Sequence, residues 1–367
     1  MLVNNVLLFL LYKKENKMSK KQNNKLEIGI DTLTLDIPTE YELLENAYDF
    51  VSDRTNNIIG TLTKKTGKTR GYRLNLNLPK CLYDSNTKPL TEFDFFHFKE
   101  IVQMVEKQMV NLFGENYPTL FVSVCEVNST VTLEKKENVE PMLNMIAHML
   151  LQKNEKVCLW CTGVKTGRRY DSVCQLKSGM QVESIKTQLL SNDRMALKIY
   201  DKQKERQKKE QKKGNEETKQ DNTGKIRFEI IYNKYGLSHA KAGQTLEEFL
   251  TVSSIKRLLD MYRKDYKIYF INKFWGNSKH SFYKECITII YNDFKRFCGK
   301  PTTVALINKQ IIEWDYAFFC KAAKQYYEKS NSADKAIKRV RNCGELQINE
   351  GVVDAFVQIS KAIINGN

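Results

Sequence analysis

The chain has 367 residues, enough for about two domains with a substantial buried core. It carries 59 Lys and Arg against 43 Asp and Glu, a formal net charge of +16 that is spread along the whole sequence. Such an excess favours an anionic partner, with nucleic acid first and a membrane surface second. The cysteine count of nine is odd and the cysteines are scattered, which indicates free thiols in a reducing cytosol and argues against a secreted disulfide framework.

The first residues form an apolar run that is too short to span a bilayer. Lysines follow this run instead of preceding it, which does not fit a secretory signal. Met18, followed by Ser and two Lys, looks like a natural start. We therefore expect residues 1–24 to be a disordered leader or a start-site artefact, with a weak interfacial anchor as the alternative.

Residues 25–242 show strand patterns interrupted by a few helical ones. Alternation of apolar and polar residues predicts strands at 26–37, 57–62, 72–78, 119–133, 157–162, 172–176, 195–200 and 226–232. Helical spacing predicts helices at 40–50, 95–113, 139–151 and 184–190. Sequential hairpins with interspersed helices favour an antiparallel sheet, and therefore an α+β fold.

The pattern changes in two places after residue 200. A charged insert over 203–225 continues as a helix and then becomes a solvated loop. Beyond residue 246 the spacing is helical, with helices predicted at 247–258, 260–272, 282–297, 303–327, 333–340 and 352–364. We expect 25–242 to be a catalytic domain and 246–367 to be an all-helical DNA-binding or accessory domain.

The most informative stretch is Leu197-Lys-Ile-Tyr-Asp-Lys-Gln-Lys-Glu205, which ends an apolar alternation at Tyr200. After the insert, Ile226-Arg-Phe-Glu229 forms a second strand-like run. A tyrosine with a lysine and carboxylates near by has the groups that a DNA-nicking reaction through phosphotyrosine needs. The alternative is that Tyr200 only packs at a sheet edge.

The residues around Tyr200 suggest separate roles. A phenol has a pKa near ~10 and needs help to ionise at neutral pH. Lys202 lies on the same face as Tyr200 if the strand continues, where it could lower the pKa of the phenol or stabilise the transition state. A divalent ion, Mg²⁺ or Mn²⁺, would polarise the phosphate, with Glu126 and Glu229 as its first candidate ligands and Glu205 as the third.

Each of those carboxylates has an alternative role in a salt bridge to Arg227, Arg194 or Lys198. These same cations are candidate DNA contacts, and so are four others: Lys68, Arg70, Arg263 and Lys264.

Other local patterns are weaker. The segment Gly67-Lys-Thr lacks phosphate-loop spacing and is better read as a basic hairpin tip. Cys158 and Cys161 have zinc-like spacing, but their alternation favours a core strand. Residues 257–275 interleave aromatics with Lys and Arg, which suits base stacking and phosphate binding. The alternative for 257–275 is an ordinary amphipathic helix.

Together these stretches resemble the replication initiators of filamentous phages, the gene II endonucleases, and related plasmid rolling-circle initiators. The likeness is carried by the opening strand 30–38, the middle strand 122–128, and the Tyr200 strand with its Arg-Phe-Glu partner. It covers roughly residues 28–240. It implies that Tyr200 nicks one strand at an origin, forms a 5′-phosphotyrosine link and later rejoins the strand. Lys202 would match the family's lysine and Glu126 its acidic residue.

The resemblance also implies origin DNA, a host helicase and a polymerase as partners, in the cytoplasm of a bacterial host, for a phage or a plasmid. No membrane role is expected. Many nickases of the wider superfamily hold their metal with a His-x-His pair. The four histidines here are too dispersed for that: His97, His148, His239 and His280.

Two classes of function therefore remain open. One is a rolling-circle initiator that nicks DNA. The other is a non-catalytic origin-binding or copy-control protein, which would explain the charge and leave Tyr200 in the core. A mobilisation relaxase and an RNA-binding protein fit less well, since the histidine cluster of the first and the stacking-sheet motif of the second are missing.

Overall fold

The computed structural model describes residues 26–66, 70–83, 88–152, 156–162, 166–172, 180–190, 195–213, 223–272 and 281–366. The predicted leader over 1–24 and the predicted loop of the charged insert from 214 to 222 lie outside these ranges. Among the described residues, none of the helices combines the length and apolar character that a membrane crossing requires.

The centre of the molecule is a ten-stranded sheet with the order β2-β3-β4-β1-β5-β10-β9-β8-β6-β7, and its neighbouring strands pair antiparallel. The strands are β1 (Leu26–Ile37), β2 (Ala47–Val51), β3 (Ile58–Lys64), β4 (Tyr72–Asn77), β5 (Phe121–Thr132), β6 (Val157–Cys161), β7 (Arg168–Tyr170), β8 (Val182–Leu190), β9 (Met195–Asp201) and β10 (Lys225–Asn233). The predicted α+β class with a helical C-terminal region is confirmed.

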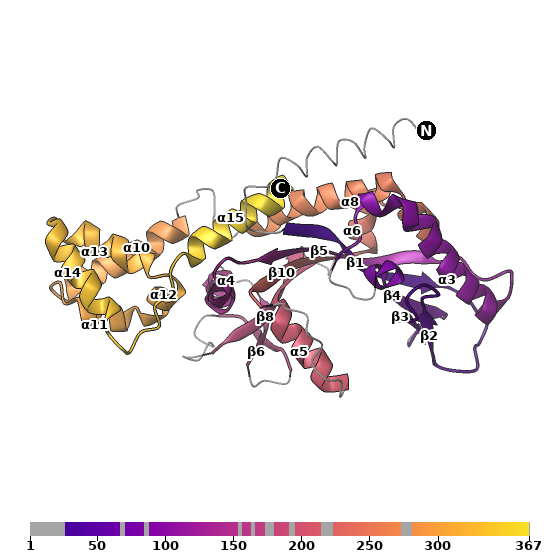
Figure 1. The fold of residues 1–367 in the computed structure, drawn as a ribbon, viewed down its shortest axis with the longest axis horizontal. Helices are drawn as coiled ribbons and strands as arrows, with labels where there is room; N and C mark the ends of the chain where they lie inside the picture. Colours follow the sequence, from indigo (N-terminus) through magenta and orange to yellow (C-terminus); the bar gives the residue numbers. More distant parts are fainter. Residues whose placement is uncertain are drawn as a thin grey trace.

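Helices interrupt the strands of the sheet in the sequence and follow the last of them. They are α2 (Leu78–Leu82), η1 (Glu92–His97), α3 (Phe98–Phe113), η2 (Lys136–Asn138), α4 (Val139–Gln152), α5 (Lys202–Lys213), α6 (Lys234–His239), α7 (Leu246–Phe249), α8 (Val252–Asp265), the π-helical η4 (Tyr266–Ile271), α10 (Ser281–Arg296), α11 (Pro301–Ile307), α12 (Lys309–Trp314), α13 (Ala317–Tyr326), α14 (Ser330–Arg341) and α15 (Val352–Asn365). Figure 1 shows α8 and α15 lying along the sheet, with α10 to α14 gathered at one end of the molecule.

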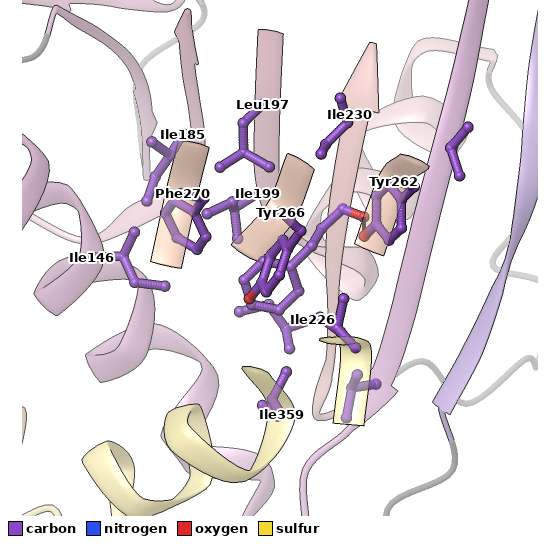
Figure 2. Packing of buried hydrophobic residues seen from close by; sticks show 14 of the residues in the cluster. Ile146, Ile185, Leu197, Ile199, Ile226, Ile230, Tyr262, Tyr266, Phe270 and Ile359 are labelled. Carbon is purple, nitrogen blue, oxygen red and sulfur yellow. Dashed lines mark hydrogen bonds between the residues drawn. The ribbon is translucent and has the colours of Figure 1, made fainter. Parts of the chain in front are cut away.

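One face of the sheet is apolar and covered by helices, and we call it the core face. Ile199 of β9 and Phe228 of β10 are paired across the two strands and fully buried. The Phe228 ring meets the Tyr266 ring edge-on at 5.7 Å between centroids. Figure 2 shows isoleucines and leucines of the strands facing the aromatic rings of α8 and η4, with Ile359 of α15 beside them.

The core face is held by polar contacts as well as by apolar packing. Tyr262 Oη lies 2.7 Å from Ser129 Oγ and donates to the Phe228 carbonyl at 3.0 Å. Tyr232 donates to Asp265 at 3.1 Å. The first helices of the predicted C-terminal domain therefore share a core with the sheet. The division into domains at residues 242–246 stays a prediction.

Two predicted helices are strands. Residues 184–190 belong to β8, in which Ile185, Thr187 and Leu189 are buried while the residues between them are partly or fully exposed. The two-residue period outweighs helical spacing here because β8 pairs with a strand on each side, β9 and β6. In the predicted helix at 40–50, only 47–51 is regular, as edge strand β2.

Three predicted boundaries also change. The partner of β6 in the predicted hairpin is 168–170, not 172–176, most of which lies outside the described residues. The predicted helix at 303–327 is three helices, because it breaks at Asn308 and Asp315. Helices 247–258 and 260–272 were expected to divide near residue 259. The chain divides instead at Leu250 and Thr251, and Thr251 caps the N-terminus of α8.

Candidate active site

The face of the sheet opposite the core face carries polar side chains, and we call it the polar face. Cross-strand register places Tyr200 of β9 beside Arg227 of β10, and Lys198 beside Glu229. Directly paired residues point to the same side of a sheet. The alternation that buries Ile199 and Phe228 under the helices therefore places these four side chains together on the other side, although up to 31 positions separate them in sequence.

Tyr200 is the centre of this group. Its hydroxyl donates to Glu229 Oε2 at 3.1 Å. The ammonium of Lys198 lies 4.5 Å from the ring centroid, and that of Lys202 lies 5.8 Å from it. The side chain is only 3% exposed. Burial, and next the negative charge of Glu229, raise the pKa of Tyr200 well above its usual value.

The structure differs from the expectation that Lys202 assists ionisation of Tyr200. The sequence placed Lys202 on the face of Tyr200 if the strand continued, where it could lower the pKa of the phenol or stabilise the transition state. The strand instead ends at Asp201, and helix α5 begins at Lys202, whose Nζ lies 3.4 Å from Glu205 Oε2. With the phenol buried and a carboxylate as its acceptor, the neutral form is favoured.

Arg227 is fully buried on the strand beside the tyrosine. Its Nε donates to Thr130 Oγ1 at 2.8 Å, and its Nη1 donates to Asp31 Oδ2 at 2.8 Å. Burial alone would lower its pKa, but Tyr200, Asp31 and Glu229 raise it, so the guanidinium stays charged. The sequence left Arg227 open as a DNA contact or as a salt-bridge partner. The structure pairs it with Asp31, a residue that the sequence analysis did not select.

Asp31 lies on the polar face at a β-bulge. The pairing of β1 with β5 shifts between Ile30 and Thr32, which leaves Asp31 as an extra residue. Its Oδ1 is buried without a hydrogen-bond partner among the described residues. The sequence signal was an acidic residue inside an apolar strand, which is costly to bury unless it is paired.

Glu126 of β5 completes the acidic part of the site. Burial comes first among the causes that raise its pKa to about 7, and the charge of Glu229 comes second. Lys198 and a hydrogen bond with Thr32 act in the opposite direction. Glu229 Oε1 lies 3.8 Å from Lys198 Nζ and has no hydrogen-bond partner among the described residues. The fold thus brings two predicted metal ligands, Glu126 and Glu229, within electrostatic reach of each other.

A divalent ion is compatible with these two oxygen ligands. Glu229 Oε1 is buried without a hydrogen-bond partner among the described residues, and the pKa of Glu126 is raised, so Lys198 compensates the negative charge of this pair only in part. The described residues contain no group of three His, Cys, Asp or Glu positioned to hold a metal. Mg²⁺ commonly takes one or two protein carboxylates and completes its shell with water and phosphate. Glu205, the third candidate, is engaged with Lys202.

Three of the other predicted DNA contacts, Arg70, Arg263 and Lys264, lie away from Tyr200. Arg70 is exposed in the connection between β3 and β4, four strands from β9 in the sheet order. Arg263 and Lys264 belong to α8, which covers the core face, and Arg263 donates to Asp260 at 2.8 Å. Arg194 and Lys68 lie outside the described residues.

The stacking hypothesis for residues 257–275 is wrong for its buried aromatics. Tyr262 and Tyr266 have no exposed surface, and their rings pack in the core. Residues 273–275, which include Trp275, lie outside the described residues. The amphipathic-helix interpretation, which places Lys on the solvated side of α8, fits the structure: Lys256 and Lys264 are exposed.

Comparison with known proteins gives little further information. No protein family model matches the chain, and no curated protein matches it. Among solved structures, the chain is similar to the rolling circle replication initiator protein from Geobacillus stearothermophilus, with a TM-score of 0.32 and 9% sequence identity over 67% of this chain and 86% of that chain. A TM-score this low carries no argument about function, which has to be argued from the residues of the polar face.

Proposed function

We propose that this chain is a rolling-circle replication initiator that nicks one strand of origin DNA with Tyr200 as its nucleophile. The observation that carries the proposal is the hydrogen bond from the Tyr200 hydroxyl to Glu229 Oε2 at 3.1 Å, with two lysine ammonium groups beside the ring. A nucleophile, a proton acceptor and cations for the phosphate therefore lie together. The sequence resemblance to gene II-type initiators and the net charge of +16 support the same assignment.

The reaction follows from these contacts. Glu229 accepts the phenolic proton as Tyr200 Oη attacks the scissile phosphorus. A bond forms between phosphorus and the tyrosine oxygen, and the bond to the 3′ oxygen breaks. That oxygen takes up a proton and leaves as a free 3′-hydroxyl, from which a polymerase can extend. Attack by a 3′-hydroxyl on the phosphotyrosine reverses these steps and rejoins the strand.

The surrounding cations have distinct parts in this reaction. Lys198 and Lys202 lie on the tyrosine ring and neutralise negative charge as the phenolate forms. The buried Arg227 is fixed by Asp31 and Thr130, so it presents a permanent positive charge next to the strand position of the nucleophile. A divalent ion, when bound at Glu126 and Glu229, supplies Lewis-acid polarisation of the phosphate. Because Tyr200 is 3% exposed, the proposal requires DNA binding to uncover it.

The test compares wild type with Tyr200→Phe on a supercoiled plasmid that carries the protein's own origin, with Mg²⁺ present. Nicked circles with covalently attached protein are expected from the wild type alone. Tyr232→Phe is the matched control, because Tyr232 is also a buried strand tyrosine bonded to a carboxylate, Asp265, but on the core face. This control should nick normally.

The same assay distinguishes the nicking initiator from the second candidate function, a non-catalytic DNA-binding protein. An origin-binding or copy-control protein would bind the plasmid tightly and give no covalent adduct with either protein. Nicking that survives in Tyr200→Phe would contradict the assignment of the nucleophile and leave the reaction class standing.

A further inference from the structure

The polar face continues outward from Tyr200 across β8, β6 and β7, and its register is continuous. Tyr200 pairs with Ser184, and Ser184 pairs with Trp160. The neighbouring row runs in parallel: Lys198 pairs with Lys186, which pairs with Cys158, which pairs with Arg169. Because paired residues share a face, both rows lie on the polar face of the sheet. They lead from the buried tyrosine to the outer edge strand β7.

The charge along these rows has one sign. Beyond Glu229, the positions paired in the two rows include three cations, Lys198, Lys186 and Arg169, and no carboxylate. Lys186 and Arg169 are exposed, and within the described part of the chain neither forms an ion pair. Both act on the thiol of Cys158, which lies between them: their charges lower its pKa against the larger, opposite effect of burial.

An aromatic ring and an unbonded hydroxyl lie beside these cations. Trp160 is partly exposed, and its indole lies against Gly167, where an added Cβ would come within 2.4 Å of ring atom Cε2. The ring is therefore held in place by the backbone before β7. Ser184, between Trp160 and Tyr200, has a buried Oγ with no hydrogen-bond partner in the described structure. A cationic row, a fixed indole and a free donor are the groups that bind phosphates and an unstacked base.

We propose that Lys186, Arg169, Trp160 and Ser184, which we call the basic strip, bind a segment of single-stranded nucleic acid and lead it to Tyr200. The strands from β9 to β7 span about 14 Å at the usual strand spacing, the reach of a few nucleotides. Lys186 and Arg169, together with the adjacent Lys198, contact phosphates, and Trp160 stacks on a base. The inference deepens the proposed nicking function, on which it rests for the direction of the strand toward Tyr200. The binding itself is independent of nicking.

The test measures the affinity for a fluorescently labelled deoxythymidine oligonucleotide of about 12 residues, within the usual site size for such surfaces. All variants are made in the Tyr200→Phe background, so that no covalent product forms, and anisotropy titrations are run over a series of salt concentrations. Loss of one phosphate contact reduces the slope of log affinity against log salt by about 0.7 for single strands. Lys186→Ala and Arg169→Ala are each expected to show that reduction.

Lys335→Ala is the matched control. Lys335 is also an exposed cation, but it lies on α14 and not on the sheet. Figure 1 shows α14 in the group of helices at one end of the molecule. The control should keep the wild-type salt slope. If Lys186→Ala and Arg169→Ala behave like Lys335→Ala, the basic strip is not a binding surface.

Trp160 is tested by two variants. Trp160→Ala should weaken binding roughly tenfold or more, and Trp160→Phe should restore most of the loss because a ring is still present to stack. Equal affinities for both variants would overturn the stacking role. Circular dichroism and thermal melting of each variant show that the sheet is intact before its affinity is compared.

The outcomes also separate this inference from the proposed function. If the strip variants lose single-strand binding and the wild type does not nick DNA, the basic strip is a binding surface and the nicking proposal is wrong. The same substitutions are also made with Tyr200 retained, for the nicking assay. If the wild type nicks, if these versions nick as well as it does, and if the Tyr200→Phe versions keep their single-strand affinity, the strip is wrong and the nicking proposal stands. An equal loss of affinity for a duplex of the same length would reassign the strip to duplex DNA and overturn the single-strand inference.

Discussion

The same strands contribute apolar side chains to one face of the sheet and charged side chains to the other. In β10, Phe228 faces the helices and packs against Tyr266, while the adjacent Arg227 and Glu229 face the other way and surround a tyrosine hydroxyl. Both faces are buried at this point, since Arg227 is 1% and Glu229 2% exposed. The core face is stabilised by apolar contact, whereas the part of the polar face around Arg227 and Glu229 is buried but charged. Burial on the polar face therefore serves electrostatics as much as packing, because charges interact more strongly away from water.

The largest expected effect tests whether the polar face depends on its ion pair. Asp31→Ala leaves Arg227 buried and without its carboxylate, which should lower the free energy of unfolding by about 3–5 kcal/mol. Denaturant unfolding measures this change. Asp53→Ala is the matched control: Asp53 pairs with Lys107 at 2.8 Å, but the side chains are 64% and 63% exposed. Its loss should cost at most about 1 kcal/mol. Equal, small effects would show that Arg227 is solvated and that the polar face is not dry.

The next effect concerns pH and the acidic pair. Glu126 has its pKa raised to about 7, first by burial and then by Glu229. The folded state then holds this proton more tightly than the unfolded chain, whose glutamates titrate near ~4.3. The corresponding stability is fully present below about pH 4 and is lost as the pH rises through 7, a change of roughly 3 kcal/mol.

Glu126→Gln should remove that pH dependence. Unfolding free energies measured between pH 4 and pH 8 check it, with Glu345→Gln, an exposed glutamate near the C-terminus, as the control that keeps the wild-type dependence. A stability profile that is unchanged by Glu126→Gln would mean that the carboxyl is solvated and does not sense Glu229.

The smallest effect is expected on the core face. Tyr262→Phe removes the hydroxyl that contacts Ser129 Oγ and the Phe228 carbonyl but keeps the ring, so it should cost only about 1 kcal/mol. DNA nicking should not change, in contrast to Tyr200→Phe. Tyr235→Phe, at a tyrosine that is 70% exposed, is the control and should not alter stability measurably. Loss of nicking in Tyr262→Phe, with stability retained, would contradict the separation of the two faces.

The sequence by itself determined most of the strands and the position of Tyr200. Leu197 and Ile199 alternate with polar residues up to Tyr200, and this two-residue period identifies a strand wherever one face is buried. The same period places Arg227 and Glu229 on one side of the next strand. The acidic candidate Glu126 was also recognisable, as a carboxylate within an apolar strand.

Only the tertiary structure decided which of these residues meet. Asp31 of β1 contacts Arg227 of β10 across the intervening strand β5, and neither this strand order nor the bulge in β1 can be predicted from local spacing. Residues 184–190 were expected to be a helix. They form a strand because they pair with β9 on one side and with β6 on the other, and local spacing does not reveal such pairing. The sequence left Tyr262 open as a base-stacking ring or as part of an ordinary amphipathic helix, and the structure buries it against the sheet. Local patterns report the propensity of a segment, whereas burial and cross-strand contact depend on partners that are distant in sequence.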